Sequence, residues 1–308
     1  MHYQITVFLL TVSVIANAQS VIPLFPEGIP CANELEDTEA FRLHLGRVLT
    51  RVHTPLLHHY VPQPQVATGA SIMILPGGGY TFSAWDHEGA DIGRYFLAEG
   101  ISVFILQYRL PKHETGKCKS EVALADARRG VQTIRMMADS LGLDPAKVAV
   151  MGFSAGGHLS ASAAIHFVDG DKDAALPVQR YSSRPDLSLP IYPVLIMDDS
   201  EAAHKGSMES LLGEKPWDEA QREKFDLPGQ VHARVPPTFL THAGDDEVVP
   251  VENSLWYYQA LLAHDVPVEM HVYAQGGHGF ASARQTELPV REWLETVKEW
   301  LRGYDFLR

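Results

Sequence analysis

The most constraining feature of this sequence is a short apolar run that leads directly into a series of small residues. Residues 148–151 (Val-Ala-Val-Met) are typical of a buried strand, and residues 159–165 are typical of a helix. Between them, Gly-Phe-Ser-Ala-Gly at 152–156 matches G-x-S-x-G. A serine in a sharp strand-to-helix turn needs small neighbours, because the backbone must fold tightly to present the hydroxyl. The stretch predicts a nucleophile at Ser154, with a purely structural turn as the alternative.

The chain around this turn alternates between apolar strands and amphipathic helices. Such alternation is typical of right-handed crossovers and of a mainly parallel sheet with helices on both faces. Residues 47–53 predict edge strands that cover the sheet. We expect further strands at residues 71–75, 101–107, 189–194, 238–242 and 268–273, and helices at residues 89–98, 121–141, 207–212, 251–263 and 288–301.

The N-terminus does not follow this pattern. Residues 5–16 form an apolar run that is too short for a stable membrane span, and it ends in the small-x-small pattern of a signal peptidase site, Ala-Asn-Ala. The usual Lys or Arg before such a run is missing, and an N-terminal anchor is the alternative. We expect a signal peptide over residues 1–18 that is cleaved after Ala18. The mature chain would then be a single domain over residues 19–308 in a secreted or periplasmic protein.

Composition limits the possible partners. The 308 residues are 45% hydrophobic and carry a formal net charge of -13. This charge argues against nucleic acid and against anionic membrane surfaces, because both need a basic face on the protein.

Cys31 and Cys118 could form a disulfide in an oxidising compartment or remain two thiols. Their spacing does not resemble a zinc site and H-E-x-x-H is absent, so we expect no metal and no cofactor.

A serine is a poor nucleophile unless a neighbouring base takes its proton. We predict His278 as this base, because it directly follows a strand and glycines leave its ring uncrowded. An acid must hold the imidazole in the correct tautomer, and the segment after another strand offers Asp245, Asp246 and Glu247. Many hydrolases of this type place the acid four residues before a proline, which favours Asp246, with Asp245 as the alternative. The chain order serine, aspartate, histidine is that of α/β-hydrolases.

Three consecutive glycines, residues 77–79, follow the predicted strand at 71–75. Glycines let the backbone approach a substrate and turn its N–H groups inward. We therefore predict an oxyanion hole from Gly78 or Gly79 together with Ala155. A phosphate-binding loop is the rival interpretation, but G-x-x-x-x-G-K-[ST] is absent. Among the other histidines, His158 on the helix behind the serine is predicted to be structural.

Six motifs occur in one order along the chain: Pro-Gly-Gly-Gly-Tyr80, Tyr108-Arg-Leu110, Gly-Phe-Ser-Ala-Gly-Gly-His-Leu159, Tyr192-Pro-Val194, Asp-Asp-Glu-Val-Val-Pro-Val-Glu-Asn-Ser254 and Gly-Gly-His-Gly-Phe280. This set resembles bacterial α/β-hydrolases of the acetyl xylan esterase type, from about residue 44 to the C-terminus. The resemblance implies the α/β-hydrolase fold, a triad of Ser154, His278 and one of the paired aspartates, and an oxyanion site at residues 77–79. Glu88 would either brace the glycine turn or lie at a solvated helix N-terminus.

The same resemblance implies a secreted serine esterase that removes acetyl groups from xylan or xylo-oligosaccharides through an acetyl-enzyme. A generic short-chain carboxylesterase or a feruloyl esterase could use the same triad. A non-catalytic carbohydrate-binding protein on a hydrolase fold is a further alternative, in which exposed aromatic rings such as Trp217, Trp256 and Tyr257 would stack on sugars. Helix packing explains Trp256 and Tyr257 more simply. All triad members are present, which argues against this last alternative.

Overall fold

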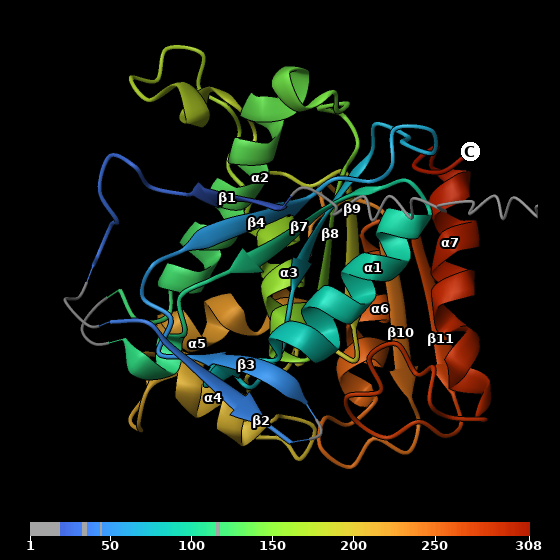
Figure 1. The fold of residues 1–308 in the computed structure, drawn as a ribbon. Helices are drawn as coiled ribbons and strands as arrows, with labels where there is room; N and C mark the ends of the chain where they lie inside the picture. The colour runs from blue at the N-terminus through green and yellow to red at the C-terminus, as the bar shows by residue number, and fades with distance from the viewer. Residues whose placement is uncertain (1–18, 33–35, 44, 115–117) are drawn as a thin grey trace, which may run out of the picture.

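A computed structural model describes residues 19–32, 36–43, 45–114 and 118–308; the predicted signal peptide, residues 1–18, lies outside the described residues. An eight-stranded sheet runs through the molecule (Figure 1). In spatial order, its strands are β1 (Gln19–Pro23), β4 (Leu56–Tyr60), β7 (Ser102–Gln107), β5 (Ser71–Leu75), β8 (Val148–Phe153), β9 (Leu187–Ile191), β10 (Thr238–Ala243) and β11 (Val268–Tyr273).

The direction of the strands divides this sheet into two parts. β1 and β4 pair antiparallel with each other, and β4 pairs antiparallel with β7. From β7 to β11 every pairing is parallel. All residues of β5, β7, β8, β9 and β10 are buried, as expected for strands covered on both faces. The sheet is therefore mainly parallel, as the alternation of strands and helices predicts.

Helices cover both faces of the sheet (Figure 1). On one face, α1 (Asp91–Ala98) contacts α7 (Trp293–Gly303), where the hydroxyl of Tyr95 donates to the carbonyl of Leu294. On the other face, α2 (Val122–Leu141) and α3 (Ala155–Ile165) pack together. Further α-helices are α4 (Lys205–Leu212), α5 (Glu219–Phe225) and α6 (Glu252–Ala263).

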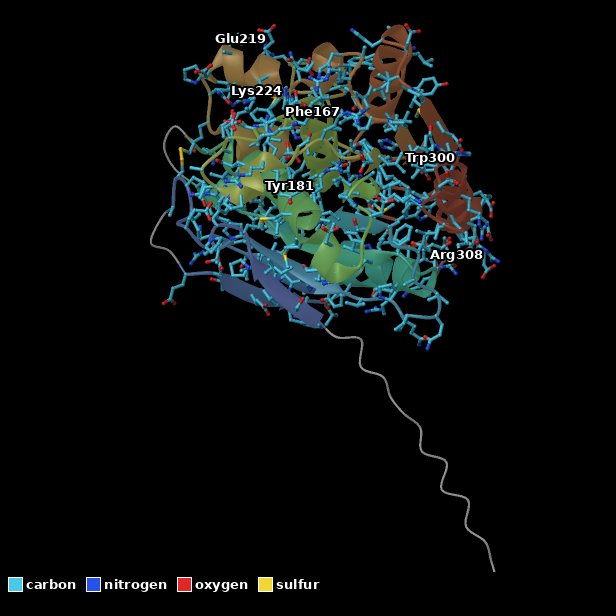
Figure 2. The ribbon with its side chains drawn as sticks, turned by 90° about the horizontal axis from the view of Figure 1, so that it is seen from above. Phe167, Tyr181, Glu219, Lys224, Trp300 and Arg308 are labelled. Atoms are coloured by element: carbon cyan, nitrogen blue, oxygen red, sulfur yellow. A yellow bond between two sulfur atoms is a disulfide. The ribbon has the colours of Figure 1, made fainter. Side chains whose placement is uncertain are left out.

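Several helices differ from their predicted bounds. A π-helix at Trp85–Ala90 precedes α1, so the helical segment begins before residue 89. α2 ends as predicted at Gly142, which adopts a left-handed φ of 67°. α5 was not predicted from the sequence. It lies on the opposite side of the molecule from α7, and Figure 2 shows Glu219 of α5 and Trp300 of α7 far apart. No helix within the described ranges is long and apolar enough to cross a membrane.

The prediction that residues 47–53 form edge strands of the main sheet is wrong. They contribute β3 (Gly46–Thr50) to a separate antiparallel sheet with β2 (Thr38–Arg42) and β6 (Phe82–Ser83). One edge of the main sheet is formed instead by β1, which pairs with β4, and neither strand was predicted. Alternation of apolar and polar residues indicates a half-buried strand, but it does not reveal which sheet the strand joins.

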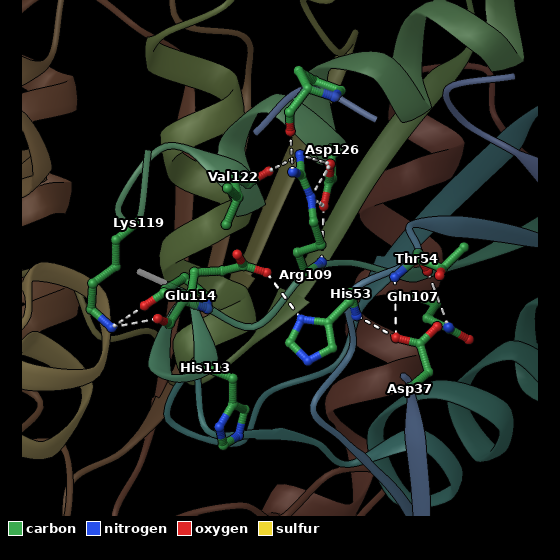
Figure 3. Close-up of polar contacts among 12 residues, drawn as sticks. Asp37, His53, Thr54, Gln107, Arg109, His113, Glu114, Lys119, Val122 and Asp126 are labelled. Atoms are coloured by element: carbon green, nitrogen blue, oxygen red, sulfur yellow. Dashed lines mark hydrogen bonds and ion pairs between the residues drawn. The ribbon is translucent and has the colours of Figure 1, made fainter. Parts of the chain in front are cut away.

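Buried polar contacts (Figure 3) and a disulfide attach the N-terminal segment to this core. Arg109, just after β7, forms a fully buried ion pair of 2.7 Å with Asp126 of α2 and also donates to the carbonyl of Pro30. Cys31 and Cys118 are paired with a Cα–Cα distance of 6.2 Å, which resolves the alternative that the sequence left open. Pro30 and Cys31 are thus fixed to the loop after β7 and to the turn before α2.

Candidate active site

Ser154 occupies the turn between β8 and α3. Its backbone has a φ of 52° and a ψ of -118°, a conformation that is costly for a residue with a side chain. The neighbouring glycines are required by close backbone contacts. A Cβ on Gly152 would lie 1.9 Å from the carbonyl oxygen of Gly156, and one on Gly156 would lie 2.1 Å from that of Leu75. The turn places Ser154 at a cavity of about 510 Å³, which we call the first cavity.

His278 approaches this serine from the loop after β11. Its Nε2 lies 2.9 Å from Ser154 Oγ, and its Nδ1 lies 2.7 Å from Oδ2 of Asp246. A carboxylate can only accept, so Nδ1 carries the proton and donates it. This tautomer leaves the lone pair of Nε2 facing the serine hydroxyl. The structure therefore brings the predicted nucleophile, base and acid into one hydrogen-bonded line.

The carboxylate of Asp246 is held on both oxygens. Oδ1 accepts the N–H groups of Val248 and Val249 at 2.9 and 2.8 Å. Oδ2 lies 3.3 Å from Nε2 of His242, a buried histidine on β10. Burial alone would raise the pKa of Asp246, but hydrogen bonds from His242 and His278 hold that pKa below its usual range. The carboxylate thus stays ionised and fixed beside the imidazole.

Asp245, the alternative acid, has a different set of contacts. Its Oδ1 accepts the N–H groups of Gly276 and Gly277, each at 2.8 Å. These glycines come directly before His278, so Asp245 shapes the loop that carries the ring. Both hydrogen bonds are made to the backbone of this loop and neither is made to the imidazole. The geometry therefore favours Asp246 as the acid and gives Asp245 a turn-capping role.

The glycine loop after β5 forms one wall of the first cavity. Gly78 has a φ of 129°, and a Cβ at this position would lie 2.1 Å from the carbonyl oxygen of Phe82. The backbone N–H groups of Gly78, Gly79 and Ala155 are not hydrogen-bonded to any residue that the structure describes. Gly78, Gly79 and Ser154 line the same cavity. These N–H groups are therefore positioned to receive negative charge that develops next to the serine.

Glu88 braces the glycine loop from inside the protein. Its Oε2 accepts the N–H of Gly77 at 2.7 Å, and its Oε1 accepts the hydroxyl of Tyr192 at 2.8 Å. The Tyr192 hydroxyl in turn accepts the N–H of Ala281 at 3.1 Å. Burial raises the pKa of Glu88, and the bonds from Tyr192 and Gly77 oppose this shift. The interpretation as a solvated helix N-terminus is wrong, because Glu88 is only 5% exposed.

Two further histidines line the first cavity and were not predicted. Nδ1 of His204 accepts the N–H of Ser207 at 3.2 Å, so in the neutral ring the proton is on Nε2. Burial lowers the pKa of His204, which favours this neutral form. His87 lies 2.9 Å through its Nε2 from the carbonyl oxygen of Gly279, to which it donates. The sequence contains 15 histidines, and no local pattern marks these two.

His158 has the structural position that was predicted for it. It is fully buried in α3, where Nδ1 accepts the hydroxyl of Tyr80 at 2.8 Å and Nε2 donates to the carbonyl of Phe225 at 2.9 Å. Burial lowers the pKa of His158 to about 4. The ring is therefore a neutral packing element behind the serine.

The proposed sugar-stacking rings do not contribute to the first cavity. Tyr257 is fully buried in α6, so helix packing and not sugar stacking accounts for it. Trp217 and Trp256 are also absent from the described residues that line the cavity. Among the described residues, no cluster of three His, Cys, Asp or Glu side chains is arranged to hold a metal ion.

Comparison with known proteins places this geometry in a family. The model of the BD-FAE family matches residues 57–261. An acetylxylan esterase of Xylanibacter ruminicola is 30% identical over 243 residues, which are 78% of this chain and 47% of that protein. Endo-1,4-beta-xylanase B of Butyrivibrio fibrisolvens is 35% identical over 218 residues, 69% of this chain and 32% of that protein. The chain thus spans about half or less of the length of these curated relatives.

The solved structures confirm the α/β-hydrolase fold that the sequence predicts. An acetyl ester-xyloside bifunctional hydrolase from Caldicellulosiruptor lactoaceticus has a TM-score of 0.83 to this chain at 34% identity. The match covers 96% of this chain and 100% of that one. The likeness therefore extends over nearly the whole chain, including the N-terminal strands outside residues 57–261.

Proposed function

The chain belongs to the BD-FAE family of serine esterases with an α/β-hydrolase fold, and we propose that it removes acetyl groups from xylan or xylo-oligosaccharides. The observation that carries this proposal is the hydrogen-bonded line from Ser154 through His278 to Asp246 at the first cavity. The relatives named above supply the substrate class, since one is an acetylxylan esterase and another an acetyl ester-xyloside hydrolase.

In the proposed acylation step, Ser154 Oγ attacks the carbonyl carbon of the acetyl ester while its proton moves to Nε2 of His278. The N–H groups of Gly78 or Gly79 and of Ala155 stabilise the oxyanion of the tetrahedral intermediate, each contributing about 3 kcal/mol in the transition state. Asp246 stabilises the imidazolium that forms. When the intermediate collapses, Nε2 returns the proton to the sugar oxygen, and the deacetylated alcohol leaves an acetyl-enzyme.

In the proposed deacylation step, water takes the place of the alcohol. Nε2 of His278 removes a proton from the water, and the resulting hydroxide attacks the acetyl carbonyl. Collapse of the second tetrahedral intermediate releases acetic acid, which ionises to acetate in solution, and Nε2 of His278 returns its proton to Ser154 Oγ. The base must be neutral at the start of each step, so we expect the rate to fall on acidification.

Export is a further part of the proposal. The predicted signal peptide at residues 1–18 supports it, and so does the pairing of Cys31 with Cys118, because disulfides persist in oxidising compartments. The chain would then meet its substrate outside the cytoplasm. Separation of cell fractions, followed by N-terminal sequencing of the mature protein, tests this; a chain that begins at Gln19 is expected.

The central experiment measures acetate release from a panel of acetylated glycans, with p-nitrophenyl acetate, butyrate and ferulate esters alongside. We expect the highest kcat/KM on acetylated xylan or its oligosaccharides and no activity for the Ser154→Ala protein. Preference for butyrate or for ferulate would instead identify a short-chain carboxylesterase or a feruloyl esterase. Full activity of Ser154→Ala on p-nitrophenyl acetate would show that the proposed mechanism is wrong. Failure of an organophosphate probe to label Ser154 would favour a non-catalytic carbohydrate-binding protein.

A further inference from the structure

A second cavity of about 370 Å³ lies beside the first and shares two lining residues with it, Leu45 and His87. Such a volume is within the range of small-ligand sites. The remaining lining residues come from the start of β3, the π-helix, the start of α1 and the segment on both sides of His278; they include Asp86, Asp91, Phe280, Arg284, Gln285 and Leu288.

His87 forms the boundary between the two cavities. Its Nε2 is fixed by donation to the carbonyl of Gly279, the residue that follows His278. Leu45 contacts both cavities from the small sheet. A ligand that extends from Ser154 past His87 would therefore enter the second cavity without leaving the protein surface.

The polar lining of the second cavity suits a neutral ligand that is rich in hydroxyl groups. It contains two carboxylates, Asp86 and Asp91, which are ion-paired with Arg47 and Arg94, and one further guanidinium, Arg284. Both carboxylates are thus already neutralised by cations of the protein and offer oxygen acceptors to hydroxyl groups. Hydroxyl groups can donate to the carboxylates and accept from Arg284 and from the amide of Gln285. Asp86 is already held in place, because its Oδ2 accepts the N–H of Arg47 at 2.7 Å.

The apolar lining suits the carbon face of a sugar ring. Phe280 lies on this wall with Leu288 and Val290, and it is packed edge-on against Tyr192 with ring centroids 4.5 Å apart. A long acyl chain would instead need a continuous apolar lining, which the charged and amide groups opposite interrupt. The combination of one apolar wall with several hydrogen-bonding groups is typical of specific ligand sites.

We propose that the second cavity is a glycan subsite, which binds the sugar unit adjacent to the one whose acetyl group reaches Ser154. This inference rests on the proposed function, and it makes the enzyme selective for acetylated oligosaccharides over single acetylated sugars. The unit in the second cavity supplies binding contacts without taking part in bond making or breaking.

Substitution of Gln285 tests the subsite. The side chain is exposed and lies outside the proposed catalytic machinery, so its replacement is compatible with folding. Gln285→Trp would fill the cavity and Gln285→Ala would remove one hydrogen-bonding group. Gln65→Trp is the matched control, because Gln65 lines a different cavity together with Arg308, a residue labelled in Figure 2.

Each variant is assayed on p-nitrophenyl acetate, on monoacetylated xylose and on acetylated xylotriose. For xylotriose we expect kcat/KM to fall about threefold in Gln285→Ala, the loss of one ordinary hydrogen bond, and at least about tenfold in Gln285→Trp. The two smaller substrates should change less than about twofold in either variant, and Gln65→Trp should leave all three substrates unchanged.

The outcomes separate this inference from the proposed function. If the wild type releases acetate from xylose and xylotriose but Gln285→Trp does not alter their ratio, the subsite is refuted and the esterase function stands. An equal loss on all three substrates would also refute the subsite, because it would indicate a general disturbance of the site. If the wild type cleaves only p-nitrophenyl acetate, the proposed xylan function fails, and the subsite fails with it.

Discussion

Two histidine–carboxylate pairs in this chain have similar contacts and very different surroundings. In one, Nδ1 of His278 lies 2.7 Å from Asp246; in the other, Nδ1 of His53 lies 3.2 Å from Oε1 of Glu114 (Figure 3). The His278 side chain is 18% exposed, whereas those of His53 and Glu114 are 3% and 4% exposed. The first pair lies at a cavity and the second is sealed within the protein.

The two pairs differ at Nε2, the ring nitrogen that does not face the carboxylate. Nε2 of His278 lies 2.9 Å from a serine hydroxyl, whereas no described residue offers a hydrogen-bond partner to the buried Nε2 of His53. The backbone N–H of His53 donates to Asp37, so this segment is tied to the strand that follows Asp37. A histidine–carboxylate pair therefore becomes a candidate base only where a nucleophile and an open cavity adjoin it.

The largest expected effect comes from removing each histidine in turn. His278→Ala should lower kcat on p-nitrophenyl acetate by at least about 10⁴-fold, because the serine loses its base. His53→Ala should change kcat less than about twofold but lower the free energy of unfolding by roughly 1–3 kcal/mol, because it removes a buried imidazole and its hydrogen bond to Glu114. Urea unfolding of both proteins supplies the second measurement. A similar loss of kcat in the two variants would contradict the comparison.

The next effect distinguishes the neighbouring aspartates. Asp246→Asn should reduce kcat by about 10³–10⁴-fold, because the amide permits the wrong imidazole tautomer. Asp245→Asn should reduce kcat by about tenfold or less, since the amide oxygen can still accept the N–H groups of Gly276 and Gly277. Circular dichroism of both variants checks that the fold is retained. If Asp245→Asn proved to be the more damaging change, Asp246 would not be the acid.

A smaller effect is expected at Glu88, which acts as a positioning residue. Glu88→Ala leaves the N–H of Gly77 without an acceptor and frees the Tyr192 hydroxyl. We therefore expect kcat to fall about 10- to 100-fold, which is no more than the fall expected from the loss of one oxyanion donor. Glu88→Gln can still accept from Gly77 and should recover most of this loss. The split between kcat and KM is the readout: equal loss in Gln and Ala variants would argue against positioning through this hydrogen bond.

The sequence sufficed for those parts of the fold that depend on local pattern. β5 and β8 are almost continuous apolar runs, and each was predicted because a strand buried on both faces has this composition. The turn at Ser154 was predicted because G-x-S-x-G between a strand and a helix is a local pattern. In contrast, β1 and β4 were missed, since each depends on antiparallel partners that are distant in sequence.

The site shows the same division between local and distant contacts. Ser154 and His278 follow strands that end at the same edge of a parallel sheet, so their meeting was predictable. The choice between Asp245 and Asp246 needed coordinates, because adjacent carboxylates differ only in the direction in which each side chain points. The burial of Glu88 was also undetermined, since its partner Tyr192 lies 104 residues later in the chain.

The smallest effect concerns histidines that contact no carboxylate. Burial lowers the pKa of His59 and of His158 to about 4, from an ordinary value of 6.5. On acidification the unfolded chain therefore takes up protons before the folded chain does. The contribution of these histidines to the free energy of unfolding should be constant above about pH 6.5 and fall between pH 6.5 and 4. The slope should be up to about 1.4 kcal/mol per pH unit for each fully buried histidine. His59→Gln cannot titrate and should have a shallower slope than the wild type in urea unfolding between pH 6.5 and 5. Parallel slopes for the two proteins would show that His59 is protonated as readily in the folded state as in the unfolded chain.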